Sequence, residues 1–389
     1  MQNPAAKTDK NHNEESFVHR VKRGAQITLS YIKNTPIVIM LVIVWIVFIF
    51  LSPNFLTANN MITLFVANAY FIVAALGETF VLISGGIDLS IAHTVTSSSL
   101  VSAIIMIDFQ SAAVAAQVNP GTGAKISDPD WWDKITGGST GVIQQEVTEA
   151  MAATAGETIL IGLAVCIIVG LAFGIINGIA IGKFGVNPFI FTLATQLIAR
   201  GISFVLSGGH SIPGIPEKLT KMSYAHGIPI TENLIFPWVI IIVLTVVIIA
   251  GILLDKTKWG RYIKMVGSNA MAAKYVGINV PNVAASAYIA SGLLAGIGGF
   301  ISMMVLGTAD VKLGDPLLLP VIGSIILGGI SMKGGEGNIM NSALGILMFA
   351  TIINGMTFLN LTIAMQQIIL GSIFVIGMSA LARLRKRRV

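Results

Sequence analysis

Apolar runs, each close to the length that crosses a membrane, recur along almost the whole chain and limit what it can fold into. A helix needs about 20 apolar residues to cross roughly 30 Å of hydrocarbon. Only 11% of the residues are charged, against about 25% in soluble domains. The sequence therefore predicts an all-α polytopic membrane protein with about ten transmembrane helices, some of them broken or short. The predicted spans are 36–51, 61–83, 89–107, 157–182, 188–207, 235–254, 284–306, 317–330, 339–359 and 362–382.

The Lys and Arg residues predict the orientation. With the N-terminus inside, the inside segments hold eighteen of these residues and the outside loops only five. Short loops rich in Lys and Arg stay in the cytoplasm. An even number of spans then places both termini in the cytoplasm, as expected of a multi-pass protein of a bacterial inner membrane in contact with lipid. Basic cytoplasmic edges also explain the net charge of +6 without a nucleic-acid partner.

The expected domain organisation has four parts. Residues 1–35 form a polar, basic cytoplasmic tail without a signal-peptide cleavage pattern. Residues 36–385 form the membrane domain. Within it, residues 108–157 are a polar outside insertion, either a surface elaboration with Trp131 and Trp132 at the membrane interface or a docking surface.

The fourth part is the inside segment 255–283, which is too polar to span. It has a partly apolar face formed by Met265, Ala272, Ala273, Val276 and Ile278. Such a face indicates a short helix that lies under the membrane against another structure, with a solvated loop as the alternative.

Small residues recur every four positions in two spans. Gly170, Gly174, Gly178 and Gly182 share one helix face, and Ser291, Ala295 and Gly299 repeat the pattern. This spacing lets a neighbouring backbone approach closely, so we expect tight helix packing there and no chemistry.

Three charged residues lie at membrane depth: Glu78, Asp88 and Arg200. A charge at such depth faces a cavity or a partner, which makes each residue a functional candidate. The structural alternative is that Glu78 and Arg200 pair with each other or with backbone carbonyls.

The motif "LISGGIDLS" breaks the apolar sequence between the second and third spans. Gly85 and Gly86 free the backbone to leave a helix, and Asp88 can cap the amides at the start of the next segment, beside Ser90. Broken backbone at this depth must be covered by protein or line a water-filled cavity. A similar motif, "IILGGISMKGGEGN" at 325–338, suggests a parallel internal repeat with two broken elements beside one pathway.

Motifs of enzymatic chemistry are missing from the sequence. It has no phosphate-binding G-x-x-x-x-G-K-[ST] loop, no H-E-x-x-H pair and no G-x-S-x-G elbow. The single cysteine, Cys166, lies in an apolar run, so we interpret it as packing. We therefore expect no catalytic or metal site and no cofactor, with any ATP bound by another chain.

Five motifs, taken together, resemble the membrane subunits of bacterial ATP-driven monosaccharide importers of the ribose, galactose and xylose type. They are "GGIDLSIA", "GVNPFIFTLATQLIARGISFVLSGG", "GRYIKMVGSNAMAAKYVGINV", "SGLLAGIGG" and "IILGGISMKGGEGN", and the resemblance covers residues 36–385. It implies ten spans, two permease copies around one pathway (a homodimer), a cytoplasmic ATP-binding subunit and a periplasmic sugar-binding protein.

The resemblance also implies site residues. The substrate pathway would involve the residues already discussed together with the element that opens the fifth span: Gly85, Gly86, Asp88, Ser90, Glu78, Asn187, Phe189, Thr192 and Arg200. The inside segment would couple to the ATPase through Gly260, Arg261, Ala272, Ala273, Gly277 and Ile278. Ala270 and Met271 stand where such permeases commonly carry an acidic residue, and the outside insertion is longer than usual.

The sequence thus favours the translocation subunit of a sugar importer that performs no chemistry itself. The alternative is a proton-coupled secondary transporter of a small polar solute that uses Glu78 or Asp88 as a proton relay.

Overall fold

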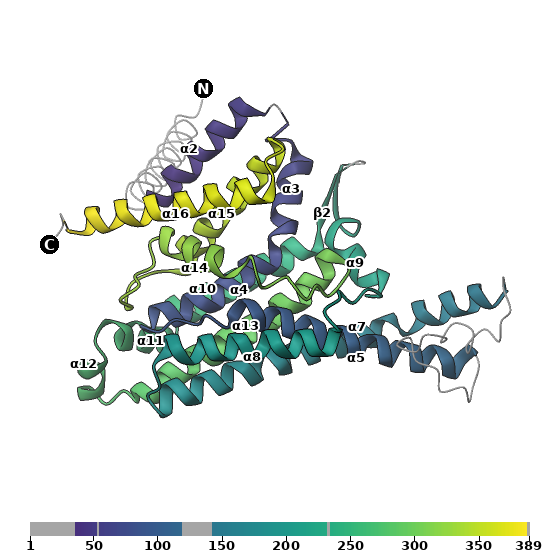
Figure 1. Ribbon diagram of the computed structural model, residues 1–389, viewed down its shortest axis with the longest axis horizontal. Coiled ribbons are helices and arrows are strands. Elements are labelled where there is room, and N and C mark those ends of the chain that lie inside the picture. Colours follow the sequence, from purple (N-terminus) through teal and green to yellow (C-terminus); the bar gives the residue numbers. More distant parts are fainter. Residues whose placement is uncertain (1–35, 53, 119–141, 232–233, 387–389) are drawn as a thin grey trace, which may run out of the picture.

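The computed structural model describes residues 36–52, 54–118, 142–231 and 234–386, which form a mainly helical protein (Figure 1). The predicted tail 1–35 lies outside the described residues, as do residues 119–141 of the insertion with Trp131 and Trp132.

Six helices of the described chain are long and apolar enough to cross a membrane. They are α5 (Ile91–Val118), α7 (Val142–Gly178), α8 (Pro188–Ser207), α10 (Trp238–Lys256), α13 (Val280–Leu306) and α15 (Ile339–Phe358). A bent pair, α3 (Ala58–Ala67) and α4 (Ala69–Ile83), adds a seventh span if the two helices count as one. Shorter apolar helices lie in α2 (Pro36–Leu51), α14 (Leu318–Leu327) and α16 (Ile363–Lys386). Each predicted run is therefore helical, while the count of ten spans and the side of each terminus stay predictions.

The predicted span 61–83 is broken rather than continuous. Its two helices, α3 and α4, meet at an angle of 50°. Asn68 separates them, and its side-chain amide donates a hydrogen bond of 2.8 Å to the carbonyl of Leu64. This local bond competes with the helical backbone pattern at the bend.

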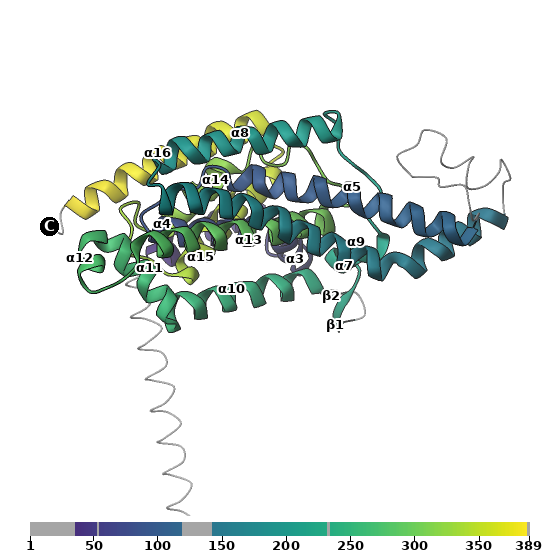
Figure 2. The same ribbon diagram turned by 90° about the horizontal axis from the view of Figure 1, so that it is seen from below.

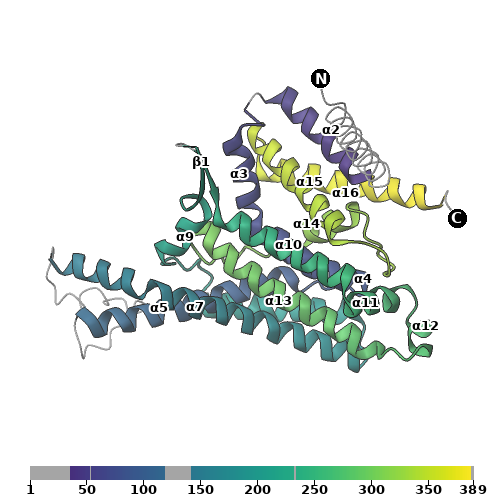
Figure 3. The same ribbon diagram turned by 180° about the vertical axis from the view of Figure 1, so that it is seen from behind.

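Smaller elements lie at two opposite ends of the molecule (Figures 1 and 3). One end holds α9 (Glu217–Tyr224) and an antiparallel hairpin of β1 (Gly227–Thr231) and β2 (Leu234–Pro237), which the sequence did not predict. The other end holds α11 (Lys258–Ser268) and α12 (Ala270–Tyr275).

Helix α13 lies at the centre, packed against α4, α5 and α7 (Figure 2). The predicted glycine face of α7 touches its backbone directly. A Cβ at Gly170 would lie 2.7 Å from the amide nitrogen of Gly296, and a Cβ at Gly174 would lie 2.7 Å from the carbonyl oxygen of Tyr288. Real Cβ atoms do not come so close to backbone atoms, so glycine is required for this approach.

Helices α5 and α7 continue side by side beyond the body of the molecule (Figure 1). The Gln110 side-chain amide joins them through a hydrogen bond of 3.2 Å to the carbonyl of Met151. The described parts of the predicted insertion are therefore helical extensions of these two spans. The π-helical turn η1 (Ile179–Lys183) ends α7 before α8 begins.

Candidate functional site

The segment after α4 leaves the helix at two glycines. Gly85 has a φ of 88°, a left-handed conformation that side chains other than glycine's rarely adopt. Gly86 is constrained by space, because a Cβ there would collide with the hydroxyl of Tyr288 on α13. The chain therefore passes close beneath α13 before α5 begins.

Asp88 is buried at the centre of this loop and accepts hydrogen bonds at both carboxylate oxygens. The backbone amide of Ser90 lies 3.0 Å from Oδ1, and its hydroxyl lies 2.5 Å from the same atom. Asn177 of α7 donates to Oδ1 at 3.4 Å, and Ser291 of α13 donates to Oδ2 at 3.0 Å. Asp88 thus holds the amide just before α5, as a cap would, and also ties the loop to α7 and α13.

Other side chains satisfy the backbone of the same loop. Glu78 Oε1 accepts from the amide of Asp88 at 3.2 Å. The amide of Leu89 donates to Thr192 Oγ1 of α8 at 3.1 Å, and Tyr288 donates to the carbonyl of Ile87 at 3.3 Å. Buried non-helical backbone is tolerated when protein satisfies its polar groups in this way.

A second polar cluster joins three elements farther along α5 and α8. Asp315, between α13 and α14, lies 3.2 Å from Nε2 of His93 through Oδ1 and 3.2 Å from Nη2 of Arg200 through Oδ2. His93 is buried, whereas the side chains of Arg200 and Asp315 are 46% and 36% exposed. The Arg200 guanidinium also lies over the ring of Phe204, 5.7 Å from its centroid. The cluster therefore presents a partly exposed carboxylate and guanidinium.

The structure does not pair Glu78 with Arg200, which was one of the two possibilities left by the sequence. It brings Glu78, Asp88, Ser90 and Thr192 into one buried group, next to an exposed Gly85 and a half-buried Gly86, and leaves Arg200 with Asp315. Asn187 caps α8 by accepting from the amides of Phe189 and Ile190 at 3.0 and 3.4 Å. The Phe189 side chain is exposed on the same helix.

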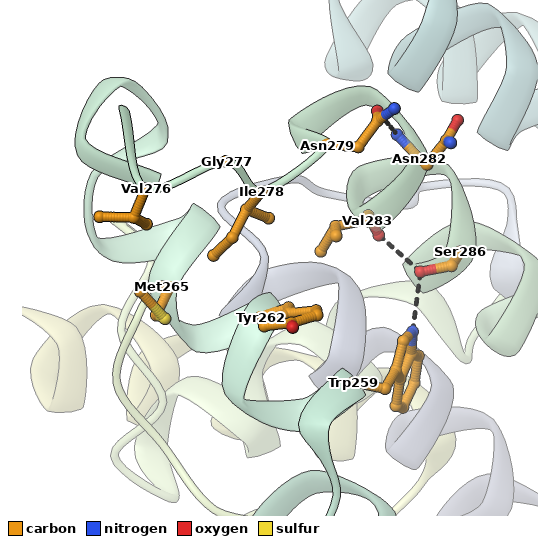
Figure 4. Close-up of a pocket in the computed structure, with 10 residues that line it drawn as sticks. All are labelled: Trp259, Tyr262, Met265, Val276, Gly277, Ile278, Asn279, Asn282, Val283 and Ser286. Carbon is orange, nitrogen blue, oxygen red and sulfur yellow. Dashed lines mark hydrogen bonds between the residues drawn. The ribbon is translucent and has the colours of Figure 1, made fainter. Parts of the chain in front are cut away.

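The inside segment 255–283 forms two short helices, as its partly apolar pattern indicated. Thr257, Asn269 and Asn279 cap α11, α12 and α13 in turn. A groove of about 570 Å³ lies between α11, the turn 276–279 and the start of α13 (Figure 4). Trp259 closes one end by donating to Ser286 Oγ at 2.8 Å.

The predicted coupling residues differ in exposure. Gly260 and Ala273 are buried, and Ile278 is half-buried. Arg261, Ala272 and Gly277 are exposed, and Gly277 has a φ of 83°. Exposed apolar side chains stand beside them on Tyr275 (84%) and Val276 (67%).

Backbone contacts connect this segment to residues 84–90, the loop between α4 and α5, which we call the broken loop. The amide of Gly335 donates to the carbonyl of Ile83, at the end of α4, at 2.8 Å. A Cβ at Gly267 of α11 would lie 2.6 Å from that same amide nitrogen, and a Cβ at Gly334 would lie 2.8 Å from the Cα of Gly85. The two glycine-rich motifs therefore meet, and α11 touches both.

Sequence reasoning missed Asn177, His93 and Asp315, and it assigned Ser291 to helix packing alone, whereas Ser291 also donates to Asp88. Asn177 and His93 are uncharged residues in spans and Asp315 is an acid in an outside loop, so none stands out as a charge in hydrocarbon. The sequence did offer one signal. In the predicted topology Asp315 lies in an outside loop, at the same side of the membrane as the outer half of the fifth span, which carries Arg200.

Apolar helices with polar and charged groups between them are typical of membrane transport proteins. Residues 60–378 match the family described as "Branched-chain amino acid transport system / permease component". The chain therefore belongs to this family of transport permeases and is a multi-pass inner-membrane protein.

Three curated relatives are similar over most of their length. The D-allose transport system permease protein of Escherichia coli is 31% identical, over 89% of this chain and 90% of the relative. The L-arabinose transport system permease protein of Escherichia coli is 30% identical, over 86% of this chain and 87% of the relative. The ribose import permease protein of Bacillus subtilis is 30% identical over 84% and 86%. These relatives are permeases rather than enzymes, and no solved structure matches the chain.

Proposed function

We propose that this chain forms the pathway of an ATP-driven importer of a monosaccharide, with ten spans and both termini in the cytoplasm. The family description names amino acids, but the three full-length relatives are permeases for D-allose, L-arabinose and ribose. The membrane domain comprises residues 36–385. A soluble periplasmic protein delivers the sugar, and ATP is bound by a cytoplasmic partner, so this chain needs no cofactor.

The pathway lies beside α8. This helix carries Arg200 among exposed apolar side chains such as Leu197 (60%) and Phe189 (54%). A guanidinium on a lipid-facing surface is costly, so we infer that a second permease copy and water cover this face. The Asp88 group holds the broken loop in shape beside that pathway, through Thr192 of the same helix.

The observation that carries the proposal is the contact between α11 and the broken loop. The exposed turn 275–278 docks on the ATPase, and Gly267 passes its movement to Gly85 and Gly335. The contacts between α11 and the broken loop are between backbones, so no flexible side chain lies between them to absorb the movement. The outer ends of α5 and α7 and the β1–β2 hairpin are the surfaces for the sugar-binding protein.

The test replaces Tyr275 and Val276 together by Asp. Both side chains are exposed, so the folded permease should tolerate the change, whereas two carboxylates at an apolar interface should expel the ATPase. We expect at least a tenfold loss of ATPase co-purification, about 1.4 kcal/mol or more, and of sugar uptake.

The control is Ile230→Asp on the hairpin, an exposed apolar residue (57%) at the opposite end of the molecule. It should retain the ATPase. If the double variant still copurifies with the ATPase and stimulates it normally, the docking surface lies elsewhere. Uptake that is abolished by collapsing the proton gradient but not by deleting the ATPase would favour the secondary transporter instead.

A further inference from the structure

A cavity of about 470 Å³ opens between the start of α14, the second half of α15 and the first half of α16. Helix α14 packs against both α15 and α16. In the proposed orientation the cavity lies in the outer half of the membrane. Its volume is within the range of about 300–1,000 Å³ typical of small-molecule sites. Its lining includes Asp315, Phe349, Gln366, Gln367, Leu370 and Phe374.

The polar groups of this cavity keep unused hydrogen-bonding capacity. The Asp315 carboxylate contacts His93 and Arg200 through one bond at each oxygen, and a carboxylate offers about four acceptor positions. Gln366 uses its side-chain nitrogen to bond the carbonyl of Leu361 at 3.0 Å, and its side-chain oxygen accepts from none of the residues that the structure describes. The side chain of Gln367, an exposed residue, has no hydrogen-bond partner among the described residues.

His93 and Arg200 hold Asp315 from two other helices, so the carboxylate is fixed before any ligand arrives. A fixed acceptor beside two amides suits a ligand that carries several hydroxyl groups in a row. Phe349 and Phe374 add apolar surface to the same cavity, which suits the C–H face of a sugar ring.

We propose that this cavity is a transient binding site for the monosaccharide on the outer side of the pathway. Asp315 accepts hydrogen bonds from two sugar hydroxyls, and Gln366 and Gln367 bind neighbouring ones. This inference rests on the proposed function and adds to it a site on the permease itself. Few polar groups and a mainly apolar lining make the site weak, and a transport site has to release its ligand readily.

The experiment uses the complete transporter in proteoliposomes. Radiolabelled D-allose, L-arabinose, D-ribose and D-galactose first identify the sugar that the wild-type transporter imports. In a Cys166→Ala background, Leu319→Cys then introduces a thiol at the mouth of the cavity, where Leu319 is 71% exposed. The imported sugar should slow labelling of this thiol by a maleimide at least threefold.

Adding Gln367→Leu to the Leu319→Cys protein should abolish the protection of the thiol by the sugar. It should also lower uptake about tenfold, as expected for a lost hydrogen bond of about 1.4 kcal/mol. Asp315→Asn should weaken protection in the same way. The matched controls lie on α16 outside this cavity: Ser372→Leu should preserve protection, and a thiol at Val375 should show none.

Labelling of Leu319→Cys that the imported sugar does not slow overturns the proposal and indicates that a lipid chain fills the cavity. Protection that survives Gln367→Leu and Asp315→Asn overturns it as well. If uptake of the sugar is driven by the proton gradient and not by the ATPase, the proposed function fails and this site fails with it. Uptake without protection leaves the proposed function standing and rejects only the site.

Discussion

Asp88 accepts four hydrogen bonds from three parts of the chain, and these bonds determine which substitutions it tolerates. Only the contacts to Ser90 are local in sequence, which is why a cap was predictable. Ser291 lies 203 positions away and Asn177 lies 89 positions away. The small-residue pattern that contains Ser291 indicates packing only, and no charge in either span points to Asp88, so the sequence could not predict this part of the site.

The variants Asp88→Asn and Asp88→Leu separate a structural role from a proton relay. Asn keeps an acceptor oxygen for the Ser90 amide, and the Ser291 hydroxyl can turn to accept from the new amide, so most sugar uptake should survive. Leu leaves a buried amide unsatisfied and should cost about 1–3 kcal/mol of folding stability. Uptake is measured per amount of inserted protein.

A relay requires a titrating group, so it predicts loss of uptake in both variants. An Asn variant as inactive as the Leu variant, with normal ATPase coupling, would mean that the carboxylate itself is needed for transport.

At the scale of elements, α4 and α14 end in the same way. The amides of Ser84, Gly85 and Gly86 donate to carbonyls four, three and five residues earlier, and those of Gly328, Gly329 and Ile330 repeat this order. The second residue of each set is left-handed, with φ of 88° and 97°. The same ending also closes α12 at Gly277 and α15 at Asn360 and is common at helix C-termini, so the parallel repeat suggested by the two glycine motifs stays a prediction.

Hydropathy located the apolar helices but not all of their limits. Helix α5 reaches Val118 and α7 begins at Val142, because polar residues outside the membrane can continue a helix that an apolar run has started. The hairpin and α9 were missed for the opposite reason: they are short outside elements without a membrane-length pattern.

The glycine face of α7 gives a test with a matched control. Gly174→Ala places a methyl group 2.7 Å from the carbonyl oxygen of Tyr288, whereas a methyl group at Gly251 of α10 meets nothing within 4 Å. The first change should destabilise the permease by about 1–3 kcal/mol. Gly251→Ala should be neutral or stabilising by up to about 1 kcal/mol.

The midpoint of thermal unfolding of the purified permease distinguishes these variants. Equal midpoints for both would show that α7 and α13 can separate without loss of stability, against the close packing described here.

At the scale of the whole molecule, the two ends carry different elements, and the proposed topology assigns each end to one side of the membrane. Lys218 on α9 and Lys274 on α12 are both exposed. With Cys166→Ala as background, Lys218→Cys should react with an impermeant maleimide in intact cells, and Lys274→Cys only after the inner face is opened. If only Lys274→Cys reacts in intact cells, the two ends lie on the opposite sides of the membrane from those proposed. If both variants react in intact cells, the proposed topology is wrong.

The contact between α7 and α13 also limits which parts can move during a transport cycle. Where two backbones touch through Gly170, Gly174 and their partners, no side chains remain that could repack to a second arrangement. Helices α4, α5, α7 and α13 should therefore turn as one rigid block. The hinge motion that opens the path alternately to each side must then fall to the helices packed around this block.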